Sequence, residues 1–306
     1  MKLAFVGLGK MGANMARRAM RGGHDVVVYD LRADAVSTME GEGARGVRSL
    51  AELSDALSAP RVVWVMLPAG DVTEHTLETL RAVLSPGDLI IDGGNSNYKD
   101  TQRRAAELTE QGFLFADVGT SGGVWGLSQG YSMMLGADDA ALELVRPVIE
   151  TLAPSPETGW GRVGPPGSGH FVKMVHNGIE YGMMQAYAEG FDLLGRKQEF
   201  ELDLPQIAEI WRHGSVVRSW LLDLTARALN ENPQLDGIAP YVTDSGEGRW
   251  TVVEAIDLNV AIPVISMALQ LRFRSRDETQ FADKLLAAMR QQFGGHAVKR
   301  TDSQQS

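Results

Sequence analysis

The chain has 306 residues, of which 44% are hydrophobic, so it can bury a large core and suggests about two domains. Its formal net charge of −10 argues against a surface built to bind nucleic acid. Cysteine is absent, which excludes disulfides and thiolate metal sites. The chain opens on no signal peptide, and no apolar run reaches the roughly 18 residues of a membrane span. We therefore expect a soluble, cytoplasmic protein without nucleic-acid or membrane partners.

A glycine-rich loop stands between a predicted strand, Lys2–Val6, and a predicted helix. Its sequence GLGKMG fits the dinucleotide-binding fingerprint GxGxxG, which carries weight only in this strand-to-helix context. The glycines permit a tight turn, the approach of a pyrophosphate and close helix packing. The loop residues predicted to bind the cofactor are Gly7, Leu8, Gly9, Lys10, Met11 and Gly12. A plain glycine-rich turn is the weaker alternative.

The second predicted strand, Asp25–Tyr29, ends at an acidic residue, Asp30, about 20 residues beyond the glycine loop. A carboxylate at this position accepts hydrogen bonds from ribose hydroxyls and repels a 2′-phosphate, which favours NAD over NADP. Arg32 keeps NADP open as an alternative, because a guanidinium can meet a 2′-phosphate. We interpret Arg32 as a solvated surface residue.

The next two predicted strands lead into loops that should face the ligand. Arg61–Leu67 runs into the turn 68–70, and we expect Leu67 and this turn to lie over the cofactor. Asp88–Asp92 is followed by Asn95, at the place where the carboxyl end of a parallel strand meets the ligand crevice. Helix capping is the alternative interpretation of this polar loop, in particular of residues 96 and 97.

A second glycine-rich loop follows the predicted strand Phe113–Val118. Residues 119–126, including Ser121, Gly122 and Gly123, expose backbone N–H groups that could surround an anion such as a carboxylate. A simple tight turn is the alternative.

Strands and helices alternate over about the first 160 residues, ending with a strand at Tyr131–Leu135 and a helix at Ala140–Leu152. This order predicts a Rossmann-type, doubly wound α/β domain. Prolines and glycines around 154–166 indicate a boundary, so we place the dinucleotide-binding domain at residues 1–163. Strand signals then fade, and an all-helical domain is predicted at 164–300. Its helices are expected at 167–194, 205–230, 251–274 and 277–293, and residues 301–306 are predicted to be disordered.

The helix predicted at 167–194 carries a polar stripe. Its members recur at i, i+3, i+4, i+7 and i+8 and are Lys173, His176, Asn177, Glu180 and Tyr181. Most of the remaining circumference is apolar, so we expect the whole helix to be buried, with Met183 and Met184 as core filler. Burying an ammonium and a carboxylate costs free energy unless they are paired or used, which makes the stripe a candidate for chemistry. A buried Lys–Glu pair that only fixes packing is the alternative.

Several segments resemble known dehydrogenases. FVGLGKMGANMA resembles the signature of the β-hydroxyacid dehydrogenases. Within them, DGGNSNYKD, DVGTSGGVWGL and GSGHFVKMVHNGIEYGMMQ together resemble 6-phosphogluconate dehydrogenase, decarboxylating, in its short bacterial form. The resemblance covers the whole chain. It implies oxidation and decarboxylation of 6-phospho-D-gluconate to D-ribulose 5-phosphate and CO2 with NAD, as in the pentose phosphate pathway and gluconate utilisation.

The resemblance also implies roles for the matching residues. Lys173 would be the general base and Glu180 the general acid, and the ammonium of the base would polarise the substrate without a metal ion. The implied substrate contacts are Asn95 (shared with the nicotinamide ribose), Ser121, Gly122, Gly123, His176, Asn177, Tyr181, Arg272, Arg290 and His296. The last two lie in a tail that resembles one completing the neighbouring subunit's site, which implies at least a dimer.

One segment departs from the family pattern. The long forms carry Lys-Gly-Thr-Gly before the tryptophan that aligns with Trp250, whereas this chain has Ser-Gly-Glu-Gly from Ser245. A carboxylate near a phosphate is unfavourable, so we expect Glu247 to point elsewhere. Phosphate binding would then depend on Arg272, Arg290 and Arg249.

Two alternative functions stay open. The first is another β-hydroxyacid dehydrogenase, of the 3-hydroxyisobutyrate or tartronate semialdehyde type, which shares the base but protonates no enediol. The second is a non-catalytic module that binds the dinucleotide as a signal. His176, Glu180 and the FGGH tail argue against the first, and the intact Lys173–Glu180 stripe argues against the second.

Overall fold

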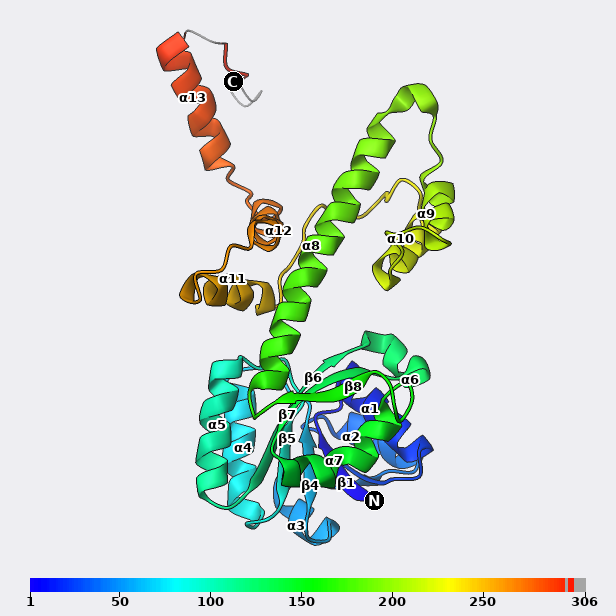
Figure 1. The fold of residues 1–306 in the computed structure, drawn as a ribbon, viewed down its shortest axis with the longest axis vertical. Helices are drawn as coiled ribbons and strands as arrows, with labels where there is room; N and C mark the ends of the chain where they lie inside the picture. The colour runs from blue at the N-terminus through cyan, green and yellow to red at the C-terminus, as the bar shows by residue number, and fades with distance from the viewer. Residues whose placement is uncertain (295–296, 300–306) are drawn as a thin grey trace. The chain divides into compact units, whose positions relative to one another are not determined.

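The computed structural model describes residues 1–294 and 297–299 (Figure 1). The chain divides into two compact units. The first contains residues 1–180 and 246–261, and the second contains residues 181–245 and the chain from 262 onwards. Helix α8 (Ser168–Arg196) is continuous from the first unit into the second. The domain boundary after residue 163 stays a prediction.

The first unit is built on an eight-stranded sheet in the order β3-β2-β1-β4-β5-β6-β7-β8. Neighbouring strands are parallel except for β6 and β7, which are antiparallel. The strands are β1 (Lys2–Val6), β2 (Asp25–Tyr29), β3 (Arg45–Gly46), β4 (Val62–Val65), β5 (Leu89–Asp92), β6 (Leu114–Ser121), β7 (Ser132–Ala137) and β8 (Trp160–Gly164). The predicted doubly wound α/β class is confirmed. Strands β3 and β8 were not predicted, because they lie at the sheet edges and lack the apolar run of a central strand.

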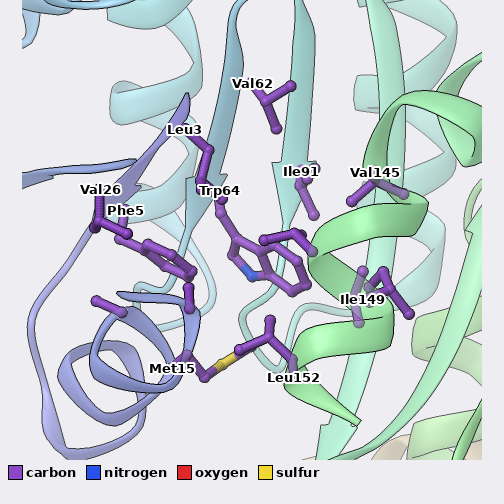
Figure 2. Close-up of a cluster of buried hydrophobic side chains, with 14 of the residues drawn as sticks. Leu3, Phe5, Met15, Val26, Val62, Trp64, Ile91, Val145, Ile149 and Leu152 are labelled. Atoms are coloured by element: carbon purple, nitrogen blue, oxygen red, sulfur yellow. The ribbon is translucent and has the colours of Figure 1, made fainter. Parts of the chain in front are cut away.

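Helices cover both faces of this sheet. One face carries α1 (Lys10–Arg21), α2 (Ala33–Gly41), α6 (Gly126–Gln129) and α7 (Asp139–Leu152). The other face carries α3 (Leu53–Ala56), α4 (Asp71–Val83) and α5 (Tyr98–Glu110). On the first face Trp64 lies fully buried, stacked on Phe5 with ring centroids 5.8 Å apart. Met15 from α1 and Ile149 from α7 belong to the same cluster (Figure 2). The core therefore needs only residues of the sheet and its own helices.

The second half of the chain is helical, as predicted, but two of its predicted helices are broken. The helices are α9 (Leu204–Arg212), α10 (Trp220–Glu231), α11 (Glu247–Asp257), α12 (Pro263–Arg274) and α13 (Phe281–Gly294). The prediction of one helix at 205–230 was wrong because Gly214, with φ 75°, ends the helical path. The prediction of one helix at 251–274 was wrong because Asn259, with φ 56°, and Pro263 interrupt it.

Apolar side chains of the helical half are more exposed than the sequence predicted. On α8, Ile179 is 52% exposed, Met183 38% and Met184 41%. The expectation that this helix is buried all round, with the two methionines as core filler, is therefore wrong for the single chain. A small core does form in the second unit, from Phe191, Ala208, Leu222, Ala226 and Leu229. Within the described ranges, no helix is both long enough and apolar enough to cross a membrane.

Candidate active site

The turn between β1 and α1 has the geometry that a dinucleotide needs. Gly7 has φ 98°, and a Cβ there would lie 2.5 Å from the carbonyl oxygen of Met66. A Cβ on Gly12 would lie 2.1 Å from the carbonyl oxygen of Gly7, so α1 packs directly against the turn. A Cβ on Gly9 would meet no atom within 4 Å, so the space over this N-cap residue is open. Open space at a helix N-terminus is what a pyrophosphate requires, and residues 7–12 therefore fit the cofactor.

The carboxylate of Asp30 is tied to the glycine turn. The backbone N–H of Leu8 donates to Asp30 Oδ2 at 2.6 Å, and the backbone N–H of Arg32 donates to Oδ1 at 2.8 Å. The Arg32 side chain is 60% exposed, as expected, yet its guanidinium also bonds to Asp30 and to the carbonyl oxygen of Leu8. A carboxylate and a guanidinium thus lie together beside the turn.

Leu67 connects the glycine turn with the loop after β5. A Cβ on Gly7 would lie 2.8 Å from Leu67 Cδ2, and a Cβ on Gly94 would lie 2.5 Å from the carbonyl oxygen of Leu67. Asn95 follows directly and is exposed. Two of the predicted cofactor contacts, Leu67 and Asn95, are therefore brought to the same end of the sheet as the glycine turn.

The next two residues of this loop have structural roles. Ser96 is buried, and its hydroxyl donates to Asp92 Oδ2 at 2.8 Å. Asn97 is the N-cap of α5, and its side chain accepts a hydrogen bond from the backbone N–H of Lys99 at 2.9 Å. The capping interpretation is confirmed for Asn97.

Strand β6 seats the start of helix α8. A Cβ on Gly119 would lie 2.4 Å from Lys173 Cβ, so only glycine lets the helix approach the strand this closely. The fully buried carboxylate of Asp117 accepts hydrogen bonds from the backbone N–H groups of Gly167, at 2.6 Å, and His170, at 2.7 Å. Burial raises the pKa of Asp117, and these donors act against that rise. Sequence reasoning missed Asp117, whose partners lie far along the chain.

The loop after β6 contains consecutive glycines with positive φ. Gly122 has φ 135° and Gly123 has φ 51°, and they follow Ser121 at the end of the strand. A Cβ on Gly123 would meet no atom within 4 Å, which leaves its backbone accessible. The predicted binding of a sugar acid by this loop stays a prediction.

Lys173 is a buried cation on helix α8. It is 7% exposed, and this burial lowers the pKa of its ammonium because an ion loses hydration inside a protein. The carboxylates of Glu180 and Glu247, in that order, raise the pKa again. A lysine in these surroundings is partly neutral at a lower pH than an exposed one.

Three further residues of the polar stripe, His176, Asn177 and Glu180, follow Lys173 on α8 within the first unit. Asn177 is buried, and its Oδ1 lies 3.0 Å from His176 Nδ1, which also lies 4.0 Å from Glu180 Oε2. The side chains of His176 and Glu180 are 39% and 40% exposed, so both can reach solvent and ligand. Lys173 and Glu180 are two turns, or roughly 11 Å of axial rise, apart. We call these four residues the acid–base group.

A second set of predicted residues gathers in the second unit. Tyr181 is 6% exposed, and its hydroxyl accepts a hydrogen bond from the backbone N–H of Ser245 at 3.2 Å. The guanidinium of Arg272 lies 3.6 Å from the centre of the Tyr181 ring and donates to the carbonyl oxygen of Thr243 at 2.8 Å. We call Tyr181, Ser245 and Arg272 the cation group. Arg276, which sequence reasoning missed, pairs with Asp244 beside it at 2.8 Å.

The sequence predicted three further phosphate candidates, Arg290, His296 and Arg249. Arg290 lies on α13, is exposed, and has no ion pair within the part of the chain that the structure describes. His296 falls outside the described residues. Arg249, the further candidate, is exposed in the first turn of α11. The structure therefore brings together part of the predicted phosphate contacts.

Comparisons with known proteins agree with this arrangement. Residues 2–161 match the model of the NAD binding domain of 6-phosphogluconate dehydrogenase, and residues 169–283 and 195–306 match the model of its C-terminal domain. A putative 6-phosphogluconate dehydrogenase of Bacillus subtilis is 45% identical over 98% of this chain and 100% of its own length. An NAD(+)-dependent, decarboxylating 6-phosphogluconate dehydrogenase of Haloferax volcanii is 42% identical over 99% of this chain and 100% of its own length.

A solved structure shows the same likeness. The chain is similar to Plasmodium falciparum 6-phosphogluconate dehydrogenase, with a TM-score of 0.84 and 26% identity over 100% of this chain and 67% of the other. Fold and site together define a dinucleotide-binding dehydrogenase with a helical second half. The chain belongs to the 6-phosphogluconate dehydrogenase family. The resemblance noted in the sequence, including its NAD-binding domain, is confirmed.

Proposed function

We propose that this chain oxidises and decarboxylates 6-phospho-D-gluconate to D-ribulose 5-phosphate and CO2 with NAD. The observation that carries the proposal is Lys173, a buried amine with a carboxylate, Glu180, two turns away on one helix. The full-length relative from Haloferax volcanii is named as NAD(+)-dependent and decarboxylating, which supports the same activity here. A non-catalytic module would have no use for a buried base.

The first step is the removal of the proton from the C3 hydroxyl of the substrate. A bound nicotinamide supplies the hydride acceptor, and Lys173 supplies the base. Burial lowers the pKa of Lys173, so a larger fraction of its amine is neutral at a given pH than for an exposed lysine. The proton moves from the hydroxyl oxygen to Lys173 Nζ.

The second step, decarboxylation, uses Lys173, and the third, protonation of the product carbon, uses Glu180. The new ammonium of Lys173 lies beside the C3 carbonyl, polarises it and stabilises the negative charge that develops as CO2 leaves. The ammonium gives its proton to the C3 oxygen as CO2 leaves, which forms the enediol and restores the neutral amine. We assign to Glu180 the delivery of a proton to the carbon that becomes C1 of ribulose 5-phosphate, while the amine takes the hydroxyl proton so that the ketone forms. Glu180 is half-exposed, so solvent can return its proton after each turnover.

The remaining predicted residues hold the substrate and the cofactor. We assign His176, Asn177 and the loop 121–123 to the sugar acid, and Asn95 to the sugar acid and the nicotinamide ribose. Arg272 and Tyr181 are assigned to the phosphate, since a guanidinium held against a ring is a fixed cation. Asp30 beside the glycine turn favours NAD, and the exposed guanidinium of Arg32 leaves room for NADP.

We also propose that the enzyme is a homo-oligomer, at least a dimer, in the cytoplasm. Large apolar side chains are exposed along the helical half, including Leu193 at 72%, Val264 at 67% and Met267 at 55%. Several large exposed apolar side chains of this kind are typical of a surface that a partner covers. We expect the tail with Arg290 and His296 to complete the phosphate site of a neighbouring subunit.

The experiment that tests the proposed function is product analysis of the purified chain. With 6-phosphogluconate and NAD we expect equal amounts of CO2, ribulose 5-phosphate and NADH, and slower turnover in a parallel reaction with NADP. The same assay with 3-hydroxyisobutyrate and glycerate, the alcohols that the alternative dehydrogenases oxidise, is the control. NADH formation from either of these without CO2 release from 6-phosphogluconate would overturn the proposal.

A further inference from the structure

Glu247, where the resemblance to the long forms implies a threonine, is buried in the first unit. It is the first residue of α11 and only 2% exposed. Its N-cap residue, Gly246, has φ 101°, a left-handed conformation that admits the sharp entry into the helix. A carboxylate removed from water is stable only where a cation or hydrogen-bond donors meet it. If Glu247 points away from the phosphate, as expected, its carboxylate must meet another group of the protein.

The first turn of α11 rests on the part of α8 that carries the base. Thr251 Oγ1 lies 2.9 Å from the carbonyl oxygen of Met174, the residue after Lys173, and 2.8 Å from the carbonyl oxygen of Glu247. A Cβ on Gly178 would lie 2.8 Å from Thr251 Cγ2, so the two helices are in direct contact at a glycine. All these residues belong to the first compact unit.

The last turns of α11 are fixed to a different element. Tyr98 of α5 donates its hydroxyl hydrogen to Glu254 Oε2 at 2.6 Å. Lys99 Nζ lies 3.2 Å from the same carboxylate and 3.0 Å from Asp257 Oδ2. Two glutamates of one helix therefore serve different neighbours: Glu254 bonds to α5, and Glu247 lies at the contact with α8.

The charged groups that face Lys173 can be named element by element. On α8 itself the carboxylate of Glu180 acts on the ammonium, and from α11 that of Glu247 does so. Strand β6 contributes Gly119, which carries no charge, and the carboxylate of Asp117 on that strand accepts from the backbone of Gly167 and His170. Among the described residues, Glu180 and Glu247 are the carboxylates that raise the pKa of Lys173.

The chemistry separates the duties of these two carboxylates. As the acid of the last step, Glu180 must hold a proton, and a neutral carboxylic acid cannot balance an ammonium. We propose, on the basis of the proposed function, that Glu247 is a positioning residue that faces Lys173 from α11 and stabilises the ammonium formed when the base takes the C3 proton. Glu247 takes no part in the proton transfer itself: the C3 hydroxyl proton moves from the substrate to Lys173 Nζ.

The test compares Glu247→Gln with wild type in the pH dependence of kcat/KM. Removing the nearby negative charge makes the ammonium less stable, so the ascending limb moves to lower pH by about one unit. The plateau value of kcat falls roughly tenfold, because the same charge no longer stabilises the ammonium formed in the reaction. KM for 6-phosphogluconate stays within about twofold, since no substrate contact is lost.

The matched control is Glu254→Gln, which removes the same charge from the same helix. Because Glu254 bonds to α5, we expect the ascending limb of the kcat/KM profile of Glu254→Gln to stay at the wild-type pH. The conservative variant Glu247→Asp keeps the carboxylate. We expect the ascending limb of its kcat/KM profile to lie between the limbs of wild type and Glu247→Gln. If Glu247→Gln fails to fold, the shift of the limb in Glu247→Asp relative to wild type tests the proposal instead.

A second readout does not depend on turnover. The rate at which acetic anhydride labels Lys173, followed by mass spectrometry across pH, reports the neutral fraction of the amine. In Glu247→Gln this titration moves to lower pH, even if 6-phosphogluconate is not the substrate. An unchanged limb and labelling curve in Glu247→Gln would overturn the proposal, as would equal shifts in Glu247→Gln and Glu254→Gln. Labelling that shifts in a chain that does not oxidise 6-phosphogluconate would instead refute the proposed function.

Discussion

The acid–base group and the cation group differ in how completely a single chain builds them. Lys173 is 7% exposed, and its surroundings come from α8, β6 and α11 of one compact unit. The cation group joins Arg272 to Tyr181 and Ser245, whereas Arg290 makes no ion pair within the described residues. The groups assigned to proton transfer are thus supplied within one unit, and those assigned to phosphate are supplied only in part.

The same contrast appears in the apolar side chains. The sheet buries Trp64, Phe5 and their neighbours completely, with helices of the same unit on both faces. Along the helical half, Leu193 and Met267 remain 72% and 55% exposed. Exposed apolar side chains of this kind support the proposed homo-oligomer, in which a second subunit would cover them. Substitutions in the acid–base group should therefore lower the rate, whereas those in the cation group or at the exposed apolar side chains should affect substrate affinity or assembly.

The largest effect is expected for Lys173→Met. Methionine fits a buried position of similar length, so the fold and NADH binding should persist while kcat falls roughly 10³-fold or more for want of a base. Turnover and fluorescence titration with NADH measure the two quantities. Lys197→Met, at a mostly exposed lysine paired with Glu199, is the control. Near-normal kcat in the Lys173 variant would remove it from the reaction.

The next effect is expected for Glu180→Gln. The amide keeps the shape of the side chain but has no acidic proton to give, so we expect kcat to fall on the order of 10²-fold. The KM should change little, because the lost interaction belongs to the protonation step. Stopped-flow detection of NADH should show a first turnover faster than the steady state. Steady-state kinetics identical to wild type would contradict the assignment.

Arg272→Ala tests the cation group. Loss of a fixed guanidinium that meets a phosphate should raise KM for 6-phosphogluconate by roughly 10- to 100-fold, with a smaller change in kcat. Arg274→Ala is the matched control, since it lies on the same helix and pairs with Asp283 at 2.8 Å. A fall in kcat with unchanged KM would show that Arg272 acts in the reaction and not in phosphate binding. The acid–base group and the cation group would then not differ in function as proposed.

The double variant Leu193→Asp and Met267→Asp should have the smallest effect on the chemistry. Its effect on assembly should be the clearest. Two carboxylates on a covered apolar surface oppose association, so the molar mass in solution should fall to that of one chain, by light scattering. Val163→Asp, at a residue 44% exposed on the sheet, should leave the mass unchanged. An unchanged mass in the double variant would show that these residues lie outside the interface.

Much of the fold could be predicted because its signals are local. The strand before Gly7, the N-cap Asn97 and the helix carrying Lys173 are each determined by a short run of sequence. The breaks at Gly214 and Asn259 were missed because apolar periodicity continues across them. The exposure of Met183 could not be predicted, since an exposed apolar residue on a helix has the same sequence pattern as one in a core.

The site shows the same limit. Residues of one helix, such as Lys173 and Glu180, could be grouped from their spacing alone. The place of Glu247 beside Lys173 depends on the contact of α11 with α8 at Gly178, which no local pattern encodes. Asp117 was missed for the same reason, because its donors belong to a distant helix start.

The central claim is that one helix takes the first proton at Lys173 and returns the last from Glu180. Its most direct test is the reaction of 6-phosphogluconate and NAD in D2O, with NMR of the ribulose 5-phosphate. An acid fixed on one side of the enediol delivers a single deuteron to C1 in one configuration, and this is the result we predict. Equal amounts of the two configurations, which free enediol in solvent would give, would contradict the claim.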